Sequence, residues 1–330
     1  MMSSTPDRAA QIAGFLDAAG WGGAARRPLA GDASFRRYDR VRLGARRAVL
    51  MDAPPAQEDV RPFVRVARFL ADHGLGAPAI LAADETNGLL LLEDLGDDLY
   101  TRVLRDGADE AALYDAAIDV LLALHAVEVL PMVPAYDEAR ILDESNLLLD
   151  WFLPAVSGRP VDEAARAGYH DALRAVLPAA FATPRRLVLR DYHADNLIWL
   201  PARAGVRRCG LLDFQDAVAG SVAYDLVSLL EDARRDVAPT VVRRAFDRYV
   251  AGAPVGHAAV EAAYAVLGAQ RNARIVGVFT RLWRRDGKPQ YLDLLARVWT
   301  YLEHDLAHPA VEPLRRWFDV HIPPAWRRRP

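Results

Sequence analysis

Residues 187 to 200 read LVLRDYHADNLIWL, and residues 209 to 216 read CGLLDFQD. In the first stretch, a short apolar run leads into a polar segment that contains Asp191 and Asn196, and a second apolar run follows. In the second stretch, an apolar run ends at Asp213. Short apolar runs bounded by turn residues are typical of small buried strands. The pattern therefore predicts a β-hairpin that holds acidic residues near its ends.

Two carboxylates and a carboxamide brought together in this way suit phosphoryl transfer. Such a site needs one carboxylate to accept the proton of a hydroxyl group. It also needs an Asn and a second carboxylate to hold Mg²⁺ on the phosphates of a nucleotide, and Asp191, Asn196 and Asp213 are the candidates. The alternative is that all three are turn and cap residues, as Asp and Asn usually are. That alternative requires all three positions to match the pattern by accident.

The segment RDYHADN (residues 190–196) resembles the catalytic loop of eukaryotic-type kinases and of the aminoglycoside phosphotransferase superfamily, which implies Asp191 as the base, with Asn196 five residues further on. LLDFQ (211–215) is similar to their metal-binding strand end, which implies Asp213 as a metal ligand. The next segment, DAVAGSVAYDLVSLL (216–230), resembles their continuation, in which an aspartate at the position of Asp225 supports the catalytic loop. The resemblance implies ATP and Mg²⁺ as cofactors. It also implies an α+β, bilobal protein-kinase-like fold, with a small β-rich N-lobe and a larger, mainly helical C-lobe.

The composition of the chain changes beyond Gly96. Before it, apolar runs predict strands at 48–51, 79–83 and 89–92. After it, Ala-, Leu- and Arg-rich patterns predict long helices at 110–129, 162–177, 222–232, 240–251, 257–285 and 291–306. Together with the resemblance to kinases, this change implies a nucleotide-binding lobe at residues 1–95 and a catalytic and substrate-binding lobe at residues 96–330.

Two segments of the first lobe are candidates for nucleotide binding. Small residues around Ser34, Phe35 and Arg36 lie between two β-like segments, where backbone amides could approach phosphates. An ordinary hairpin turn is the alternative. LLEDLG (residues 91–96) resembles the linker between the two lobes, where the backbone beside Glu93 and Leu95 would bind the adenine edge. A strand end with ordinary acidic residues is the alternative there.

The chain departs from the family pattern on the third strand. Protein kinases and most aminoglycoside phosphotransferases carry a lysine there, but residues 48–52 contain none. The phosphates would then be neutralised by Mg²⁺ and by another cation, with Arg36 and Arg37 as candidates. Leu189 also stands where a histidine is usual, two positions before the catalytic aspartate.

These departures resemble one branch of the superfamily, the bacterial anomeric sugar kinases of cell-wall recycling. The matching segments are DASFRRY (32–38), MDAPP (51–55), LDFQDA (212–217), QRN (270–272) and RDGKP (285–289). Those enzymes phosphorylate N-acetylmuramate and N-acetylglucosamine at the C1 hydroxyl. The resemblance implies the same ATP-dependent reaction here, on a small-molecule amino sugar in peptidoglycan recycling. The alternatives are a phosphotransferase for aminoglycosides or other small-molecule hydroxyl groups, and a non-catalytic kinase-like binding module.

Three residues are candidates for binding the sugar. Arg271 and Asn272 lie on the predicted 257–285 helix, and Trp151 could stack on a sugar ring. For the Arg-Asn pair, the alternative is a solvated helix face or an interhelix hydrogen-bond pair. For Trp151, the alternative is a core aromatic residue.

The composition is that of an ordinary globular protein, with 330 residues, 52% hydrophobic and 26% charged. A formal net charge of -3 gives no global field that would recruit nucleic acid or an anionic membrane. The single cysteine, Cys209, excludes an internal disulfide framework. No run approaches the roughly twenty apolar residues of a membrane span, and residues 1–10 show no signal peptide. We therefore expect a cytoplasmic protein.

Overall fold

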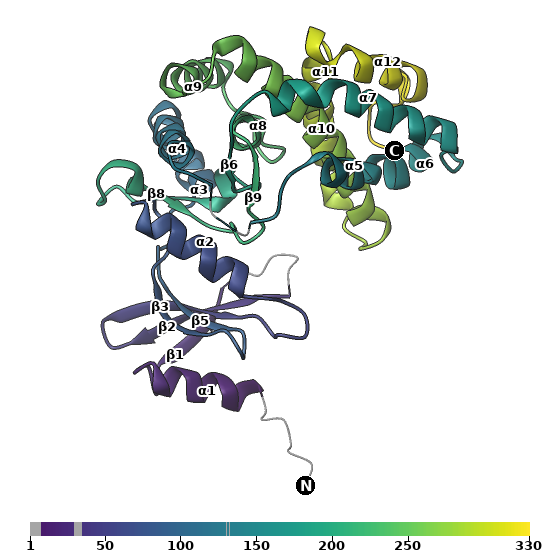
Figure 1. Cartoon of the computed structure of the whole chain (residues 1–330). Helices are drawn as coiled ribbons and strands as arrows, with labels where there is room; N and C mark the ends of the chain where they lie inside the picture. Colours follow the sequence, from purple (N-terminus) through teal and green to yellow (C-terminus); the bar gives the residue numbers. More distant parts are fainter. Residues whose placement is uncertain (1–7, 30–34, 130, 132) are drawn as a thin grey trace. The chain divides into compact units, whose positions relative to one another are not determined.

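The fold begins with a five-stranded antiparallel sheet in the computed structural model, which describes residues 8–29, 35–129, 131 and 133–330. The strand order is β1-β2-β3-β5-β4. The strands are β1 (Ala25–Pro28), β2 (Arg37–Leu43), β3 (Arg46–Asp52), β4 (Ile80–Asp84) and β5 (Leu89–Glu93). Two helices accompany them, α1 (Arg8–Ala18) and α2 (Arg61–Asp72), and they lie on opposite faces of the sheet (Figure 1). Thr5, Pro6 and Asp7, a combination typical of a helix start, lie outside the described residues.

A small apolar core fixes α1 on one face of this sheet. Ile12 and Leu16 lie one helical turn apart and pack with Val41 of β2 and Leu50 of β3. Because successive side chains of a strand point to opposite faces, the arginines beside Val41 lie on the face away from α1.

The remaining helices build a larger core around one long helix, α10 (His257–Arg284). It packs against α5 (Glu138–Leu147), α7 (Glu163–Phe181), α8 (Ala223–Leu230) and α11 (Leu295–Leu306) (Figure 1). A Cβ on Gly277 would lie 2.3 Å from the carbonyl oxygen of Leu147, so only glycine permits this close approach of α10 to the end of α5. The other helices are α3 (Tyr100–Arg105), α4 (Glu110–His125), α6 (Leu153–Ser157), α9 (Pro239–Gly252) and α12 (Glu312–His321).

The three apolar runs of the central stretch form two separate strand pairs. β7 (Leu197–Trp199) and β8 (Cys209–Leu211) form the predicted antiparallel hairpin. The first run belongs to β6 (Arg185–Val188), which instead pairs with β9 (Val218–Ser221). The prediction of one hairpin for the whole stretch is therefore wrong for the first run. The partner of β6 is β9, whose sequence VAGS contains only one large apolar residue and therefore gives a weak strand signal.

The chain divides into two compact units, which we call the sheet unit and the helical unit. The sheet unit consists of Met1–Val103 and Asp195–Asp216, and the helical unit consists of Leu104–Ala194 and Ala217–Pro330. The prediction of an α+β fold, with a small antiparallel sheet followed by a mainly helical part, is confirmed. The predicted boundary between residues 95 and 96 stays a prediction.

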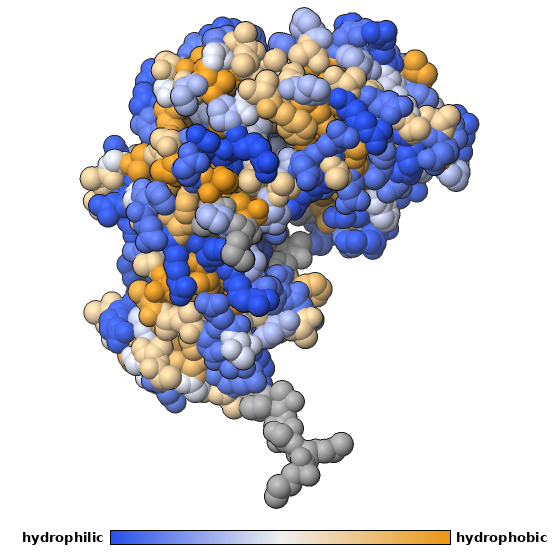
Figure 2. All heavy atoms as spheres, in the orientation of Figure 1, coloured by the Kyte–Doolittle hydropathy of each residue, from blue (hydrophilic) through white to orange (hydrophobic). Residues whose placement is uncertain are grey.

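Hydrophilic side chains cover much of the face shown in Figure 2, with apolar patches between them. The large hydrophobic side chains that are exposed in the described part of the chain are Phe35, Leu81, Phe181 and Val320. Isolated hydrophobic side chains of this kind are normal on a surface in contact with water. None of the helices found in the described ranges is long and apolar enough to cross a bilayer.

Candidate active site

A strained turn at Arg190 precedes Asp191. The Asp191 amide donates to the carbonyl oxygen of Leu189 at 3.0 Å, which closes a three-residue turn around Arg190. Arg190 has φ = 72°, so this is a γ-turn of the uncommon kind with positive φ. Such backbone strain persists only where the surrounding structure enforces it, and it is concentrated at functional sites.

Three contacts within the helical unit enforce this turn. The Asp225 carboxylate accepts from the backbone N–H of Leu189 at 2.6 Å and from that of Arg190 at 2.9 Å. The hydroxyl of Ser228 donates to the carbonyl oxygen of Arg190 at 3.1 Å. The Arg190 guanidinium donates to both carboxylate oxygens of Glu144, at 2.8 and 2.9 Å. The prediction that Asp225 binds the backbone of the loop is confirmed.

Replacing Asp225 by alanine should lower both the melting temperature and the activity. The change leaves two backbone donors without their acceptor, and a buried unsatisfied donor costs about 1–3 kcal/mol. For a chain of this size we expect the melting temperature to fall by several degrees in a thermal scan. Asp225→Asn, which keeps one acceptor oxygen, should lie between wild type and Asp225→Ala. An unchanged melting temperature in Asp225→Ala would contradict this role.

His193 lies in the same loop but does not have the environment of a general base. Its side chain is buried, and its Nε2 lies 3.2 Å from Nη1 of Arg234. Burial lowers the pKa of His193 well below its ordinary value, and the positive charges of Arg234 and Arg271 lower it further. The neutral ring therefore accepts from Arg234, which supports a positioning role for His193.

Asn196 and Asp213 lie at the open end of the β7–β8 hairpin, within the sheet unit. Leu197 pairs with Leu211, and the backbone N–H of Leu212 donates a hydrogen bond to the carbonyl oxygen of Asn196 at 3.0 Å. The residue after Leu212 is Asp213, with φ = 56°. A stacked contact between Phe214 and Phe63 of α2, with ring centroids 4.8 Å apart, anchors the chain immediately after it.

A glycine fixes the hairpin against the rest of the sheet unit. The Leu211 amide donates to the carbonyl oxygen of Gly76 at 3.1 Å. A Cβ on Gly76 would lie 2.2 Å from the carbonyl oxygen of Cys209, so no other residue fits there without moving the strand. The backbone that carries Asn196 and Asp213 is therefore held by the contact of Phe214 with α2 and by the hydrogen bond to Gly76.

The donor set at this end of the hairpin fits a magnesium ion. Asn196 and Asp213 both offer oxygen atoms, which Mg²⁺ prefers. The Asp213 Oδ1 accepts from Gln215 at 3.0 Å and from Arg36 at 3.3 Å, so it already attracts donors and a positive charge. Within the described ranges, no group of three or more His, Cys, Asp or Glu side chains could hold a metal by itself. Mg²⁺ that is bound mainly by phosphates and water needs only one or two protein ligands.

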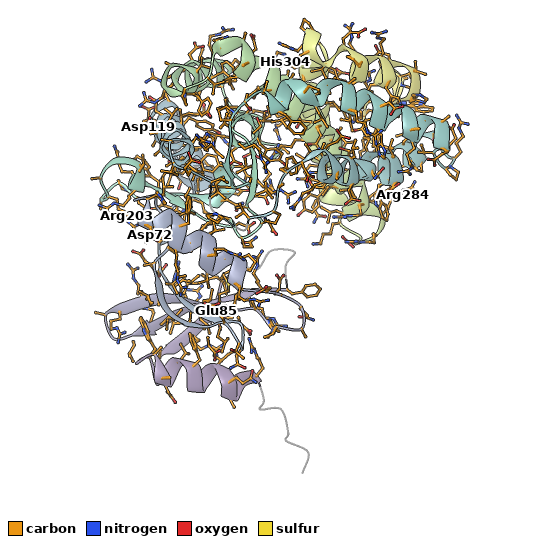
Figure 3. The ribbon with its side chains drawn as sticks, in the orientation of Figure 1. Asp72, Glu85, Asp119, Arg203, Arg284 and His304 are labelled. Atoms are coloured by element: carbon orange, nitrogen blue, oxygen red, sulfur yellow. The ribbon has the colours of Figure 1, made fainter. Side chains whose placement is uncertain are left out.

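The structure describes four of the five residues predicted to bind the nucleotide, whereas Ser34 lies outside the described residues. Phe35 is exposed, and the Arg36 side chain is largely buried where it meets Asp213. Glu93 ends β5, and its Oε1 accepts at 2.5 Å from Arg203, which is labelled in Figure 3. Leu95 is half-buried. The role of these residues in nucleotide binding stays a prediction.

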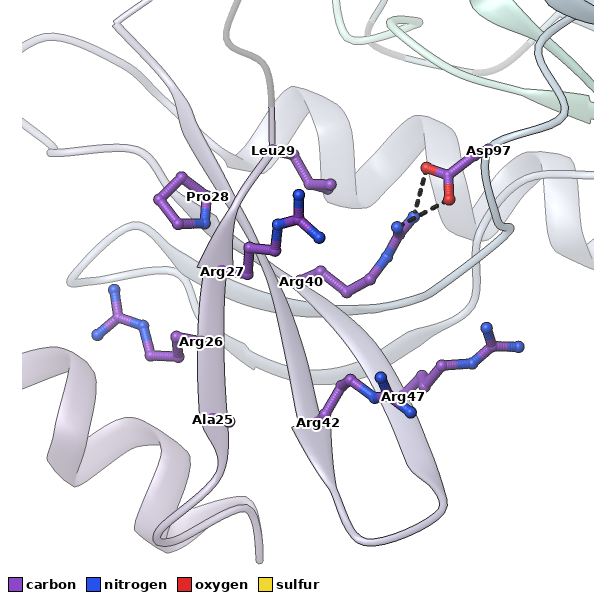
Figure 4. A pocket seen from close by; sticks show the side chains of 9 residues that line it. All are labelled: Ala25, Arg26, Arg27, Pro28, Leu29, Arg40, Arg42, Arg47 and Asp97. Carbon is purple, nitrogen blue, oxygen red and sulfur yellow. Dashed lines mark hydrogen bonds and ion pairs between the residues drawn. The ribbon is translucent and has the colours of Figure 1, made fainter.

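A basic cavity of about 500 Å³ opens on the face of the sheet away from α1. Figure 4 shows its lining, with the guanidinium groups of β1, β2 and β3 around it. Arg40 donates to both oxygens of Asp97, at 2.8 and 2.9 Å. Arg27, Arg42 and Arg47 have no hydrogen-bonded carboxylate among the described residues. The sheet unit thus supplies several cations, although its third strand lacks the usual lysine.

Arg271 and Asn272 lie inside the helical unit, on the buried side of α10. The Arg271 Nη2 donates to the Ser228 hydroxyl at 2.9 Å, and that hydroxyl in turn supports Arg190. The Asn272 Nδ2 donates to carboxylate oxygens of Glu231 at 2.6 Å and Asp305 at 2.9 Å. This arrangement supports the alternative of an interhelix hydrogen-bond pair. Direct contact of the two residues with the sugar stays a prediction.

Glu231 and Asp305 form a buried acid pair that shares this one amide group. Burial raises the pKa of Glu231 to about 7 and raises that of Asp305 well above its ordinary value. Two carboxylates this close and this buried do not both ionise near neutral pH. The pair therefore holds a proton in the folded protein that the unfolded chain would release.

The acid pair should make stability depend on pH. Each folded pKa is raised, so the stabilisation is complete below the unfolded pKa, near 4.5, and is lost as pH rises through about 7. Asp305→Asn cannot ionise at this position. Its melting temperature relative to wild type should therefore rise by a few degrees between pH 5 and pH 8. The melting temperature of Glu231→Gln relative to wild type should rise over the same pH range. If the difference in melting temperature between either variant and wild type did not depend on pH, the two carboxyl groups would not share a proton.

Trp151 lies in a π-helical turn, Leu148–Phe152, that continues α5. Its side chain is half-buried, whereas the neighbouring Phe152 is fully buried and packs against Trp299. π-helical turns occur often at functional sites. Stacking of Trp151 on a sugar stays a prediction.

The amino-acid sequence is similar to those of known sugar kinases. The N-acetylmuramate/N-acetylglucosamine kinase of Caulobacter vibrioides is 41% identical over 365 residues, which covers 99% of this chain and 100% of the relative. The protein of the same name from Pseudomonas aeruginosa is 41% identical over 288 residues, covering 85% of this chain and 83% of the relative.

Solved structures share the fold at low sequence identity. A choline/ethanolamine kinase family protein from Mesorhizobium loti has a TM-score of 0.63 at 16% identity, covering 93% of this chain and 97% of that one. The complex of the aminoglycoside phosphotransferase APH(2″)-IIa with streptomycin and ATP has a TM-score of 0.60 at 16% identity, with 95% and 99% covered. The expected kinase-like fold is confirmed.

The sequence profile of one family matches residues 25–267, which include both strand pairs and the strained turn at Arg190. The chain therefore belongs to the phosphotransferase enzyme family.

Proposed function

We propose that this protein is an ATP-dependent sugar kinase that phosphorylates the C1 hydroxyl group of N-acetylmuramate and N-acetylglucosamine, in the recycling of peptidoglycan. The observation that carries the proposal is the similarity to relatives of that name in several bacteria, at 35% to 41% identity over most of the chain. We expect the protein to act in the cytoplasm, where ATP is available.

Asp191 is the proposed catalytic base. It follows the strained turn at Arg190, whose backbone is fixed by Asp225 and Ser228. A carboxylate held in this way can orient the sugar hydroxyl towards the phosphate and accept its proton as the bond to phosphorus forms. The leaving group is the ADP oxygen.

Asn196 and Asp213 are the proposed magnesium ligands, through their side-chain oxygens. The bound ion would neutralise charge on the phosphates. Arg36 supplies a positive charge beside Asp213, in a protein whose third strand has no lysine. We propose that it contributes to holding the phosphates, together with the backbone near Ser34 and Phe35. The backbone beside Glu93 and Leu95 would bind the adenine edge.

A phosphotransferase for aminoglycosides is the second candidate function. A solved structure that shares the fold holds streptomycin and ATP, but at 16% identity this likeness shows the fold alone. Aminoglycosides are polycations and would require an acidic acceptor site. The catalytic loop here is instead flanked by arginines on α5 and α10.

Phosphorus NMR of the reaction product tests the proposal. The protein is incubated with ATP and Mg²⁺ and with N-acetylmuramate, N-acetylglucosamine or kanamycin in parallel. We expect a product from each amino sugar, with the phosphate coupled to the anomeric proton, and none from kanamycin. Coupling to the C6 methylene protons would overturn the anomeric assignment. Turnover of kanamycin alone would favour the second candidate.

A further inference from the structure

Glu144 of α5 lies among three arginines from three parts of the helical unit. Arg190 of the catalytic loop binds it at 2.8 and 2.9 Å, and Arg140 of α5 binds it at 3.1 Å. The third is Arg274 of α10, whose Nε lies 3.6 Å from Glu144 Oε2. We call Arg140, Arg190, Arg274 and Glu144 the arginine cluster.

The arginine cluster carries an excess of positive charge. Three guanidinium groups face one carboxylate, which leaves two positive charges uncompensated within the cluster. The charge of Asp191 also acts on Arg274 and raises its pKa. The side chains are 11% exposed at Arg190, 19% at Arg274 and 31% at Arg140, so the excess charge is only partly solvated.

Arg274 is the member of the cluster with the fewest hydrogen bonds. It makes none within the described residues, whereas Arg190, whose buried Nε also lacks an acceptor there, donates through Nη2 to Glu144. The only ion pair of Arg274 with a described residue is the long one to Glu144. By contrast, the nearby Arg271 donates to Ser228 and to the carbonyl oxygen of Glu231. A mostly buried guanidinium group without acceptors is costly unless a ligand supplies them.

Glu144 itself is held in place and cannot turn to satisfy Arg274. The Tyr136 hydroxyl lies 3.2 Å from Glu144 Oε2 and 3.2 Å from Gln270 Oε1. The Arg190 guanidinium also lies over the Tyr136 ring, 5.6 Å from its centroid. The cluster is therefore a preformed arrangement in which Arg274 lacks a hydrogen-bond acceptor among the described residues.

We propose that the arginine cluster binds the carboxylate of a sugar acid, with Arg274 as its main ligand, and that this carboxylate is the lactyl group of N-acetylmuramate. The proposal rests on the proposed function. Arginine binds carboxylates through paired, charge-assisted hydrogen bonds, and the excess positive charge of the cluster suits an anionic ligand.

The position of the cluster agrees with this substrate. Arg190 immediately precedes Asp191 in the chain. Burial alone would lower the pKa of Arg274, but the attraction of Tyr224, Glu144 and Asp191 more than offsets it and raises the pKa. On the sugar, one ring carbon separates C1 from C3, which bears the lactyl ether. In the proposed pose, a carboxylate at Arg274 would bring the sugar to the segment that carries Asp191. N-Acetylglucosamine lacks the lactyl group and would leave Arg274 without this ligand.

Kinetics with the two sugars test the assignment. Arg274→Met removes the charge and keeps a long side chain. We expect its kcat/KM for N-acetylmuramate to fall about 10- to 100-fold, the effect of a lost charge-assisted hydrogen bond. Its kcat/KM for N-acetylglucosamine should stay within about threefold of wild type. Arg274→Lys should recover part of the loss. The methyl ester of N-acetylmuramate is neutral, so the kcat/KM for this ester should be similar in Arg274→Met and in wild type.

A matched control is Arg244→Met on α9, where the exposed side chain pairs with Asp115. It should leave both sugars unaffected. An equal loss for both sugars in Arg274→Met, or no loss for N-acetylmuramate, would overturn the assignment. If Arg274→Met does not fold, Arg140→Gln, at the most exposed arginine of the cluster, gives the same comparison. If the wild-type protein phosphorylates neither sugar, the proposed function itself is wrong, which is a separate outcome.

Discussion

Replacing Asp213 by alanine should abolish Mg²⁺-dependent turnover while the protein stays folded. The carboxylate is 36% exposed and follows strand β8, whose backbone is held by Asn196 and Gly76, so its removal leaves no buried cavity. A metal ligand contributes several kcal/mol of transition-state stabilisation, and we expect kcat to fall by about 1000-fold or more. The measurement is turnover of N-acetylglucosamine over a Mg²⁺ titration, with the melting temperature recorded in parallel.

The matched control is Asp216→Ala, which removes an exposed carboxylate three residues away. It should keep nearly full activity. Chelation of Mg²⁺ by EDTA should reduce wild-type turnover to the level of Asp213→Ala, and added Mg²⁺ should restore only the wild type. Activity close to wild type in Asp213→Ala, at ordinary Mg²⁺ concentrations, would remove Asp213 from the metal site.

Local patterns in the sequence predict much of this fold because each pattern determines its own element. The apolar runs at Leu197 and Cys209 become the hairpin β7–β8, since both are short and a turn joins them directly. The long helix α10 is recognised from its length and composition, and its predicted end differs from the observed one by a single residue. α11 is shorter than predicted because the chain first forms a 3₁₀ turn, Pro289–Leu294.

Contacts between distant segments are what the sequence does not reveal. β6 pairs with β9, thirty residues away, rather than with the adjacent run. The γ-turn at Arg190 depends on Asp225 and Ser228, and only the resemblance to kinases pointed to the first of them. Arg190 is an ordinary arginine in the sequence, and nothing local predicts that φ is positive there.

The same limit applies to the residues proposed to bind the substrate. The sequence pattern of α10 predicts a helix, but it does not indicate which of its arginines is hydrogen-bonded to a neighbouring helix. Arg271 donates to Ser228 and to the carbonyl oxygen of Glu231, although its Nε lacks an acceptor, whereas Arg274, nearly one turn further on, makes no hydrogen bond in the described part of the chain. No sequence pattern indicates a role for Glu144, because the patterns described above do not predict α5. The only sequence signal was the acidic N-cap at Asp137, followed by Glu138.

Substitutions at Asp191 should separate proton transfer from positioning. Removal of a general base typically costs about 100- to 10,000-fold in rate, and Asp191→Ala loses both the base and the hydrogen bond that orients the sugar hydroxyl. We therefore expect Asp191→Ala to lose nearly all activity. Single-turnover assays with saturating ATP measure the loss in the phosphoryl-transfer step itself.

Asp191→Asn should retain more activity than Asp191→Ala, by about ten- to a hundredfold. A hemiacetal C1 hydroxyl is more acidic than an ordinary alcohol, so less of the barrier depends on proton transfer to the base. The loose transition state of phosphoryl transfer mainly requires the nucleophile to be in line with the γ-phosphate. An amide of the same size on the same fixed backbone can still orient the hydroxyl through a hydrogen bond. Equal activities in the two variants would show that proton acceptance, and not orientation, is the main contribution of Asp191.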